Sequence, residues 1–279
     1  MLGPRNSFSC STPAEYVVRY SLAAIVACYT FLIIVEFCRG RSLWLDEAFI
    51  YHSLVSKNLP QLFGGPLVYG QQFPRVYLGL IYALPKIAGE DPLYLRLIPA
   101  FFGIAACVIW VKFFFEFFWI KQRKVLPCLL SAGLFLSNGY ALYYACELKQ
   151  YSAEMFFAGI LFLLYTTSEF AEDRRYVLAS IFCVASLLFS YSAVFVIIGL
   201  GFTMLFDGEL LYLWKVHRRG LLLTALALMM TCSATYLLDL RFGENPTNGG
   251  VLHSYWATSF PQGSSFVMKL DSLFNLRVS

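Results

Sequence analysis

The sequence predicts an all-α protein that crosses a membrane about seven times, because it contains that many apolar segments near the ~20-residue length needed to span a bilayer. Hydrophobic residues make up 59% of the 279 residues and charged residues 14%. Average soluble domains hold about 45–50% and about 25% of these classes. A soluble fold leaves much of its surface exposed and could not bury so much apolar area. A bilayer is therefore the expected solvent.

The expected spans, in chain order, are 17–37, 97–118, 126–146, 151–170, 176–191, 193–213 and 221–240. The fifth is short, and only Tyr191 and Ser192 separate it from the sixth, so that boundary is the least defined. The first is too long for the apolar core of a signal peptide and lacks a cleavage site, so we expect it to be retained. The chain then divides into an N-terminal segment, a transmembrane domain with one long outer loop, and a final outer segment: 1–16, 17–240 with the loop 38–96, and 241–279.

Basic residues predict the orientation of these spans. The connections after the second, fourth and sixth spans hold eight Lys or Arg residues, whereas the short connections on the opposite side hold only Lys149. Cytoplasmic loops are enriched in Lys and Arg, so we expect the N-terminus and these connections to be cytoplasmic. Segments 38–96 and 241–279 would then face the outside or a lumen. The eight residues are Lys121, Arg123, Lys124, Arg174, Arg175, Lys215, Arg218 and Arg219.

The first outer loop has structure of its own. Residues 44–55 have the composition of a helix, and a Gly/Pro-rich turn follows at 62–66. The apolar run 73–87 is about 15 residues, too short for a span, so an interfacial or re-entrant helix is expected there. If this run did cross, the charge bias of every later loop would be inverted. Segment 241–279 is rich in Gly, Ser, Asn, Pro and aromatic residues and is expected to be a surface loop.

Asp46 and Glu47 are the first catalytic candidates, in the segment S-L-W-L-D-E-A-F that follows the first span. Neighbouring residues on a helix point about 100° apart, so both carboxylates cannot face one reacting atom. One could take a proton from an attacking hydroxyl, while the other caps the helix, forms an ion pair or binds a metal. The alternative is that both acids only stabilise a helix N-terminus.

The segment E-L-K-Q-Y-S-A-E at 147–154 is the second candidate, where the third span turns into the fourth. Lys149 could bind an anionic headgroup or a phosphate. Glu154 lies about one turn inside the fourth span, where a carboxylate is costly unless it faces protein or water. Alternatively, Glu147, Lys149 and Glu154 neutralise one another near the interface.

Two arginines in the outer loop are weaker candidates for binding a phosphate. Arg96, at the start of the second span, could reach a lipid phosphate or serve as a span-end anchor, and Arg75 resembles it. Gln150 and Tyr151 complete the set of candidate site residues.

Cysteine and histidine spacing predicts no metal site. Most of the eight cysteines lie within spans, where cysteine behaves as a small apolar residue. Cys38 and Cys146 both fall near the outer face, so a disulfide is possible there, although free thiols are favoured. The three histidines are isolated in the sequence, so no zinc constellation is visible.

Several segments together resemble a known family. They are W-L-D-E after the first span, the Pro-containing run 71–78, the small pair Ala88–Gly89, L-R-L-x-P at 95–99, E-L-K-Q-Y-S at 147–152 and the aromatic segment 254–261. In this order they look like the polyprenyl-phosphate-sugar glycosyltransferases of the GT-C fold. That group includes the protein O-mannosyltransferases and the lipid A aminoarabinose transferase. The resemblance covers nearly the whole chain as a loose pattern, and none of its motifs is specific alone.

The resemblance implies transfer of a sugar from a polyprenyl-phosphate donor to a hydroxyl of a glycan, lipid or protein acceptor, on the outer face of a bacterial plasma membrane. Asp46 would be the general base, with Glu47 as second choice, and Lys149, Arg96 and Arg75 would contact the donor phosphate. Some relatives use a divalent cation, and the sequence does not decide this point. No nucleic-acid partner is expected.

The chain departs from the family in two ways. Many relatives have Arg where Lys149 stands, and Arg would bind phosphate in a bidentate manner that Lys does not offer. Relatives also usually have more spans and a further outer domain, so this chain is expected to be an N-terminal portion.

Two other classes of protein remain as alternatives. One is a non-catalytic accessory or scaffold protein, or an inactive truncated remnant, whose carboxylates are only interfacial. The other is a lipid or solute transporter, which the lack of internal repeats and of paired interrupted spans disfavours. An enzyme should place Asp46 beside a basic group at a cavity, whereas a scaffold should leave it facing water.

Overall fold

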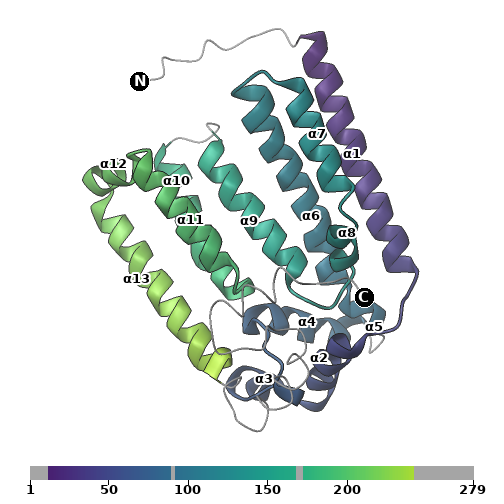
Figure 1. Ribbon diagram of the computed structural model, residues 1–279. Helices are drawn as coiled ribbons and strands as arrows, with labels where there is room; N and C mark the ends of the chain where they lie inside the picture. The colour runs from purple at the N-terminus through teal and green to yellow at the C-terminus, as the bar shows by residue number, and fades with distance from the viewer. Residues whose placement is uncertain (1–11, 89–91, 168–171, 242–279) are drawn as a thin grey trace, which may run out of the picture.

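The computed structural model describes residues 12–88, 92–167 and 172–241, and within these ranges every regular element is a helix. Figure 1 shows long helices lying side by side, with the short helices α2 to α5 gathered at one end. The predicted all-α class is therefore confirmed for the described part of the chain. The predictions for residues 1–11 and 242–279, including the aromatic run 254–261, concern residues outside the described ranges.

The first two long helices form the centre of one apolar cluster. Helix α1 (Pro13–Cys38) starts four residues before the expected span, where the Thr12 hydroxyl accepts a hydrogen bond from the Glu15 amide at 3.3 Å. Helix α6 (Leu97–Phe114) continues as the π-helical segment η2 (Phe115–Ile120). Buried residues of α1, α6, η2, α7 and the α8 region pack together here, among them Val18, Tyr29, Ile33, Cys107, Trp119 and Cys128.

The remaining long helices follow in order across the molecule. Figure 1 shows α9 beside α6, and α13 at the edge farthest from α1. Their bounds are α7 (Val125–Leu136), α8 (Gly139–Ala145), α9 (Tyr151–Thr166), α10 (Glu172–Phe189), α11 (Ala193–Phe206), α12 (Glu209–Val216), α13 (Arg218–Thr235) and the π-helical η3 (Tyr236–Leu240).

Two of the expected spans are broken helices. Helices α7 and α8 meet at 53° within the expected span 126–146, because Asn138 starts a new helix by accepting from the amides of Tyr140 and Ala141. Helices α11 and α12 meet at 89° within the expected span 193–213. Gly208 lies at this bend with φ of 76°, a left-handed conformation that glycine adopts without steric cost.

Within the described ranges, three helices are long and apolar enough to cross a membrane, or up to five if each bent pair counts as one span. The three are Pro13–Cys38, Leu93–Ile120 and Arg218–Leu240, which match the first, second and seventh expected spans. Helix α9 is a shorter apolar helix, and α10 begins with the charged run E-D-R-R. The described chain is thus a multi-pass membrane protein by length and composition.

Segment 38–96, the predicted outer loop, contains five short helices in its described residues. They are α2 (Leu45–Ser56), α3 (Leu59–Gly64), η1 (Val68–Gly70), α4 (Arg75–Ala88) and α5 (Pro92–Leu95). A helix was expected at 44–55 and again within 73–87, and both are present. Helix α4 continues past Pro85 to Ala88.

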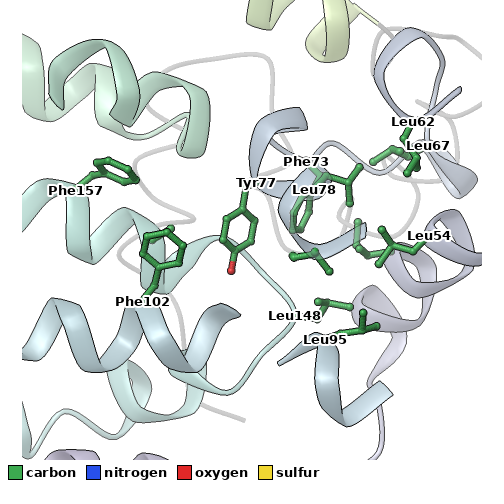
Figure 2. Packing of buried hydrophobic residues seen from close by; sticks show 13 residues of the cluster. Leu54, Leu62, Leu67, Phe73, Tyr77, Leu78, Leu95, Phe102, Leu148 and Phe157 are labelled. Carbon is green, nitrogen blue, oxygen red and sulfur yellow. The ribbon is translucent and has the colours of Figure 1, made fainter. Parts of the chain in front are cut away.

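A second apolar cluster fixes this loop to the long helices. Figure 2 shows Phe73, Tyr77 and Leu78 of the α4 region between the side chains of α2 and α3 and the rings of Phe102 and Phe157. Phe73, Tyr77 and Leu78 are fully buried, and the Tyr77 hydroxyl donates to the Lys149 carbonyl at 3.1 Å. Helix α4 therefore packs against α6 and α10, where the Tyr77 ring contacts Phe102 and Phe189.

The two ends of the bundle carry different segments. In Figure 1 the start of α1, the α6–α7 connection and α12 lie at one end, and α2 to α5 lie at the other with the turn between α8 and α9. The basic residues used to predict orientation occur in the first group of segments or next to it, as expected of one membrane face.

Candidate functional site

The candidate site is built where α2 begins. Glu47 lies in the first turn of α2, and its Oε2 accepts a hydrogen bond from the Trp44 amide at 3.2 Å. This contact satisfies an amide that precedes the helix and fixes where the helix starts. Glu47 is completely buried.

Arg96 neutralises Glu47. Its Nε lies 3.1 Å from Oε1 and one terminal nitrogen lies 2.7 Å from Oε2, and Arg96 is also buried. The Leu148 amide donates to Oε1 at 2.7 Å. Glu47 thus receives four N–H donors, as a buried carboxylate requires. The pair joins α2, the start of α6 and the α8–α9 turn.

Arg96 also fixes the chain between α1 and α2. Its terminal nitrogens donate to the carbonyl of Arg41 at 2.6 Å and to that of Ser42 at 3.3 Å. All of its described contacts are with protein groups. The expected contact of Arg96 with a donor phosphate would have to compete with these bonds.

Asp46 is in a different environment from its neighbour. Its Oδ2 lies 3.3 Å from Lys149 Nζ, with 40% of the Asp46 side chain and 9% of the Lys149 side chain exposed. The helix therefore separates the two acids as the sequence predicted: Glu47 is buried in a network, and Asp46 borders solvent beside a cation. Asp46, Glu47, Lys149 and Arg96 lie at the same end of the bundle.

Lys149 forms its ion pair with Asp46, and its charge also acts electrostatically on Glu147. Glu147 Oε1 accepts from the Trp44 indole nitrogen at 2.7 Å. Glu154 is hydrogen-bonded to the hydroxyls of Ser190 and Ser192. The ion pair of Lys149 is with Asp46, because the turn 146–150 runs against the start of α2.

Glu147 is the least satisfied carboxylate of the site. It is completely buried, and its Oε2 has no hydrogen-bond partner. Burial raises the pKa of Glu147 above its usual value, although the bond from Trp44 opposes this effect. A carboxyl in this position favours its neutral form.

Arg75 contacts other residues than Asp46 and Lys149. Its guanidinium pairs with Asp239 at 2.5 Å and donates to the Leu62 carbonyl, and both partners of the ion pair are buried. Asp239 also accepts from the Phe73 amide at 2.9 Å and from the Tyr191 hydroxyl. Arg75 therefore fixes η3 to the outer loop, which does not favour the expected contact with a donor phosphate.

Asp239 is a residue that sequence reasoning missed. It is an acid inside the last apolar segment, and such a group is costly in a membrane unless it has a partner. That signal was available in the sequence. The identity of the partner was not, because Arg75 lies 164 positions away.

Aromatic side chains lie at this end of the bundle, and Tyr151 is close enough to Asp46 to interact with it electrostatically. Tyr151 is 37% exposed, and its ring centroid lies 4.6 Å from that of Tyr144. The Arg41 guanidinium lies 3.8 Å from the centre of the Tyr143 ring. Gln150, the last candidate, precedes α9, and its Oε1 is buried without a partner.

The described ranges contain no candidate metal site and no disulfide between Cys38 and Cys146. No group of three or more His, Cys, Asp and Glu residues there could hold a metal ion. Cys38 and Cys146 are both free thiols.

No protein-family model, no curated protein and no solved structure matches this chain.

Proposed function

We propose that this protein is a glycosyltransferase that moves a sugar from a polyprenyl-phosphate donor to an acceptor hydroxyl at the membrane surface. The observation that carries the proposal is the contact between Asp46 and Lys149, a partly exposed carboxylate beside a cation. The resemblance of the outer loop to GT-C enzymes supplies the substrate class. The proposal includes a GT-C-like topology of seven passes with α2 to α5 as interfacial helices and a cytoplasmic N-terminus.

The pair can perform the two tasks that this transfer requires. Asp46 takes the proton of the acceptor hydroxyl as its oxygen attacks the anomeric carbon. The bond from that carbon to the phosphate oxygen breaks, and the electron pair leaves with the polyprenyl phosphate. Lys149 stabilises the negative charge that develops on this phosphate.

The structure also suggests an order of events. With Lys149 paired to Asp46, the carboxylate is neutralised before substrate binds. A donor phosphate, carrying more negative charge, would compete for the ammonium group. Donor binding would then release Asp46 to act as a base.

Glu47 and Arg96 have a positioning role in this proposal. Glu47 is buried and receives four N–H donors, so it is poorly placed to accept a substrate proton. Its network fixes the first turn of α2 against the 146–150 turn. That arrangement holds Asp46 and Lys149 in contact.

The test is sugar transfer by membranes containing the full chain, with a panel of radiolabelled polyprenyl-phosphate sugars. Asp46→Asn should abolish turnover, and Lys149→Gln should raise the KM for the donor, at unchanged expression. Asp173→Asn is the matched control, because that carboxylate is 85% exposed on a different helix. Full activity of Asp46→Asn would show that Asp46 is not the general base. An inactive chain that binds no donor would favour the accessory or scaffold alternative.

A further inference from the structure

A cavity lies in the half of the bundle that contains α12. Helices α9, α10, α11 and α13 form its walls, with α12 across one end, and its volume is about 670 Å³. Cavities that bind small ligands have volumes of about 300–1,000 Å³. In Figure 1, α12 lies at the end of the bundle opposite α2. The cavity is therefore separate from the Asp46 site.

The interior of this cavity suits a hydrocarbon chain. Its walls are mainly aliphatic, with Leu161, Leu164, Ile197, Leu200 and Leu221 among the lining residues. The inner hydroxyls of Ser180 and Thr224 are 3.0 Å apart, and Tyr176 lies 3.3 Å from Thr224. Because these hydroxyls bind one another, they do not require a polar ligand.

Charged groups of both signs border the cavity near α12. Arg175 lies in the first turn of α10 and donates to the Thr167 carbonyl at a long 3.4 Å. Asp207 and Glu209 flank the bend between α11 and α12. All three line the cavity, and Asp207 also accepts a hydrogen bond from the Tyr165 hydroxyl at 2.5 Å. A cation beside two carboxylates complements a headgroup that carries both charges.

We propose that this cavity binds one zwitterionic phospholipid whose headgroup carries a primary ammonium, such as phosphatidylethanolamine. An acyl chain lies between α9, α10, α11 and α13. The phosphate contacts Arg175, and the ammonium contacts Asp207 and Glu209. The site does not depend on the proposed sugar transfer, since it shares no residue with it.

Two glycines of α11 allow a matched test of the cavity. Gly201 lines the cavity, and a Cβ added there would have no atom within 4 Å. Gly199, two residues earlier, has equal space but is exposed and does not line the cavity. Gly201→Phe should therefore fill the cavity, while Gly199→Phe adds the same ring outside it.

The measurement is lipid retention by the delipidated full chain, titrated with phosphatidylethanolamine and followed by native mass spectrometry. Wild type and Gly199→Phe should bind one lipid per chain. Gly201→Phe should raise the apparent Kd by about tenfold or more. Equal binding by the two variants would overturn the proposal.

The headgroup is tested by comparing lipids. Phosphatidylglycerol carries the phosphate without the ammonium, and it should bind about tenfold more weakly than phosphatidylethanolamine. Asp207→Asn combined with Glu209→Gln should remove this difference. Equal affinity in the wild type, or tighter binding of a polyprenyl phosphate, would overturn the zwitterionic assignment.

A test on the unmutated chain covers the case in which Gly201→Phe fails to fold. Cys183 lines the cavity, whereas Cys232 is exposed on α13 and does not. Bound phosphatidylethanolamine should slow alkylation of Cys183 by N-ethylmaleimide by several-fold and leave Cys232 unchanged. Equal rates at Cys183 with and without saturating lipid would contradict the proposal.

Discussion

Arg96 and Glu47 form a bidentate ion pair that is almost inaccessible to solvent, with nitrogen–oxygen distances of 3.1 and 2.7 Å. The pair joins residues 49 positions apart and lies between three segments of the chain. A buried pair of this kind adds little stability over apolar residues, but loss of one partner leaves an uncompensated charge. Its main effect is to fix the relative position of α2 and α6.

Arg96→Leu is therefore expected to destabilise the protein by about 3–5 kcal/mol. Asp46→Asn should cost less than about 1 kcal/mol, because the ion pair that it removes is partly exposed to solvent. Thermal unfolding in detergent, followed by gel filtration, measures both. Similar small shifts for the two variants would show that the Glu47 network is not structural.

The pair formed by Arg75 and Asp239 allows a double-mutant test. Each single change, Arg75→Met or Asp239→Leu, should destabilise by about 3–5 kcal/mol because it leaves a buried charge. The double variant should be more stable than either single variant, since neither charge remains. Additive losses in the same unfolding assay would contradict a direct interaction.

Gly103 of α6 packs directly against Ala145 of α8. A Cβ added at Gly103 would lie 2.5 Å from the Ala145 Cβ, so Gly103→Ala should force the helices apart and destabilise by about 1–3 kcal/mol. Gly133→Ala on α7 is the matched control, because a Cβ there meets nothing within 4 Å. That change should be neutral or stabilise by up to about 1 kcal/mol. The melting temperatures of the two variants should move in different directions or by clearly different amounts.

Glu147 should make the stability of the folded protein depend measurably on pH. Burial raises its pKa in the folded state above the ordinary value of about 4.3, so the folded state holds this proton more tightly than the unfolded state. Its contribution to stability is therefore full at pH values below about 4 and is lost as the pH rises through the folded pKa.

Glu147→Gln removes this proton equilibrium but keeps an oxygen that can accept from Trp44. The stability of the variant relative to wild type should increase as the pH rises from about 4, and then become constant. Melting temperatures across a pH series measure the difference. Parallel curves for the two proteins would show that Glu147 does not titrate in this range.

Local patterns in the sequence predicted the parts of the site that depend on local geometry. The helix at 44–55 and the divergence of Asp46 and Glu47 follow from 3.6 residues per turn, and the structure contains both. Glu47 caps the helix and pairs with Arg96, which are two of the roles expected for one of the two acids. Whether Asp46 acts as a base stays a prediction.

Partners distant in sequence could not be predicted in the same way. Arg96 and Arg75 are each an isolated arginine in the sequence, and only the fold brings them to Glu47 and Asp239. The breaks at Asn138 and Gly208 interrupt apolar runs whose composition alone reads as continuous. Hydropathy reports the average apolar character of a segment. A single residue that ends one helix and begins another hardly changes this average.

Buried ion pairs hold the α2 end of the helical bundle together. At the α2 end, Glu47 and Arg75 tie the outer loop to α6, to the α8–α9 turn and to η3 through buried charges. At the α12 end, His217 pairs with Asp173, whose side chain is 85% exposed, and such pairs contribute at most about 1 kcal/mol. The α12 end is also where the helices enclose the cavity of about 670 Å³. A lipid that enters this cavity would therefore not need to disturb the Asp46–Lys149 site at the α2 end.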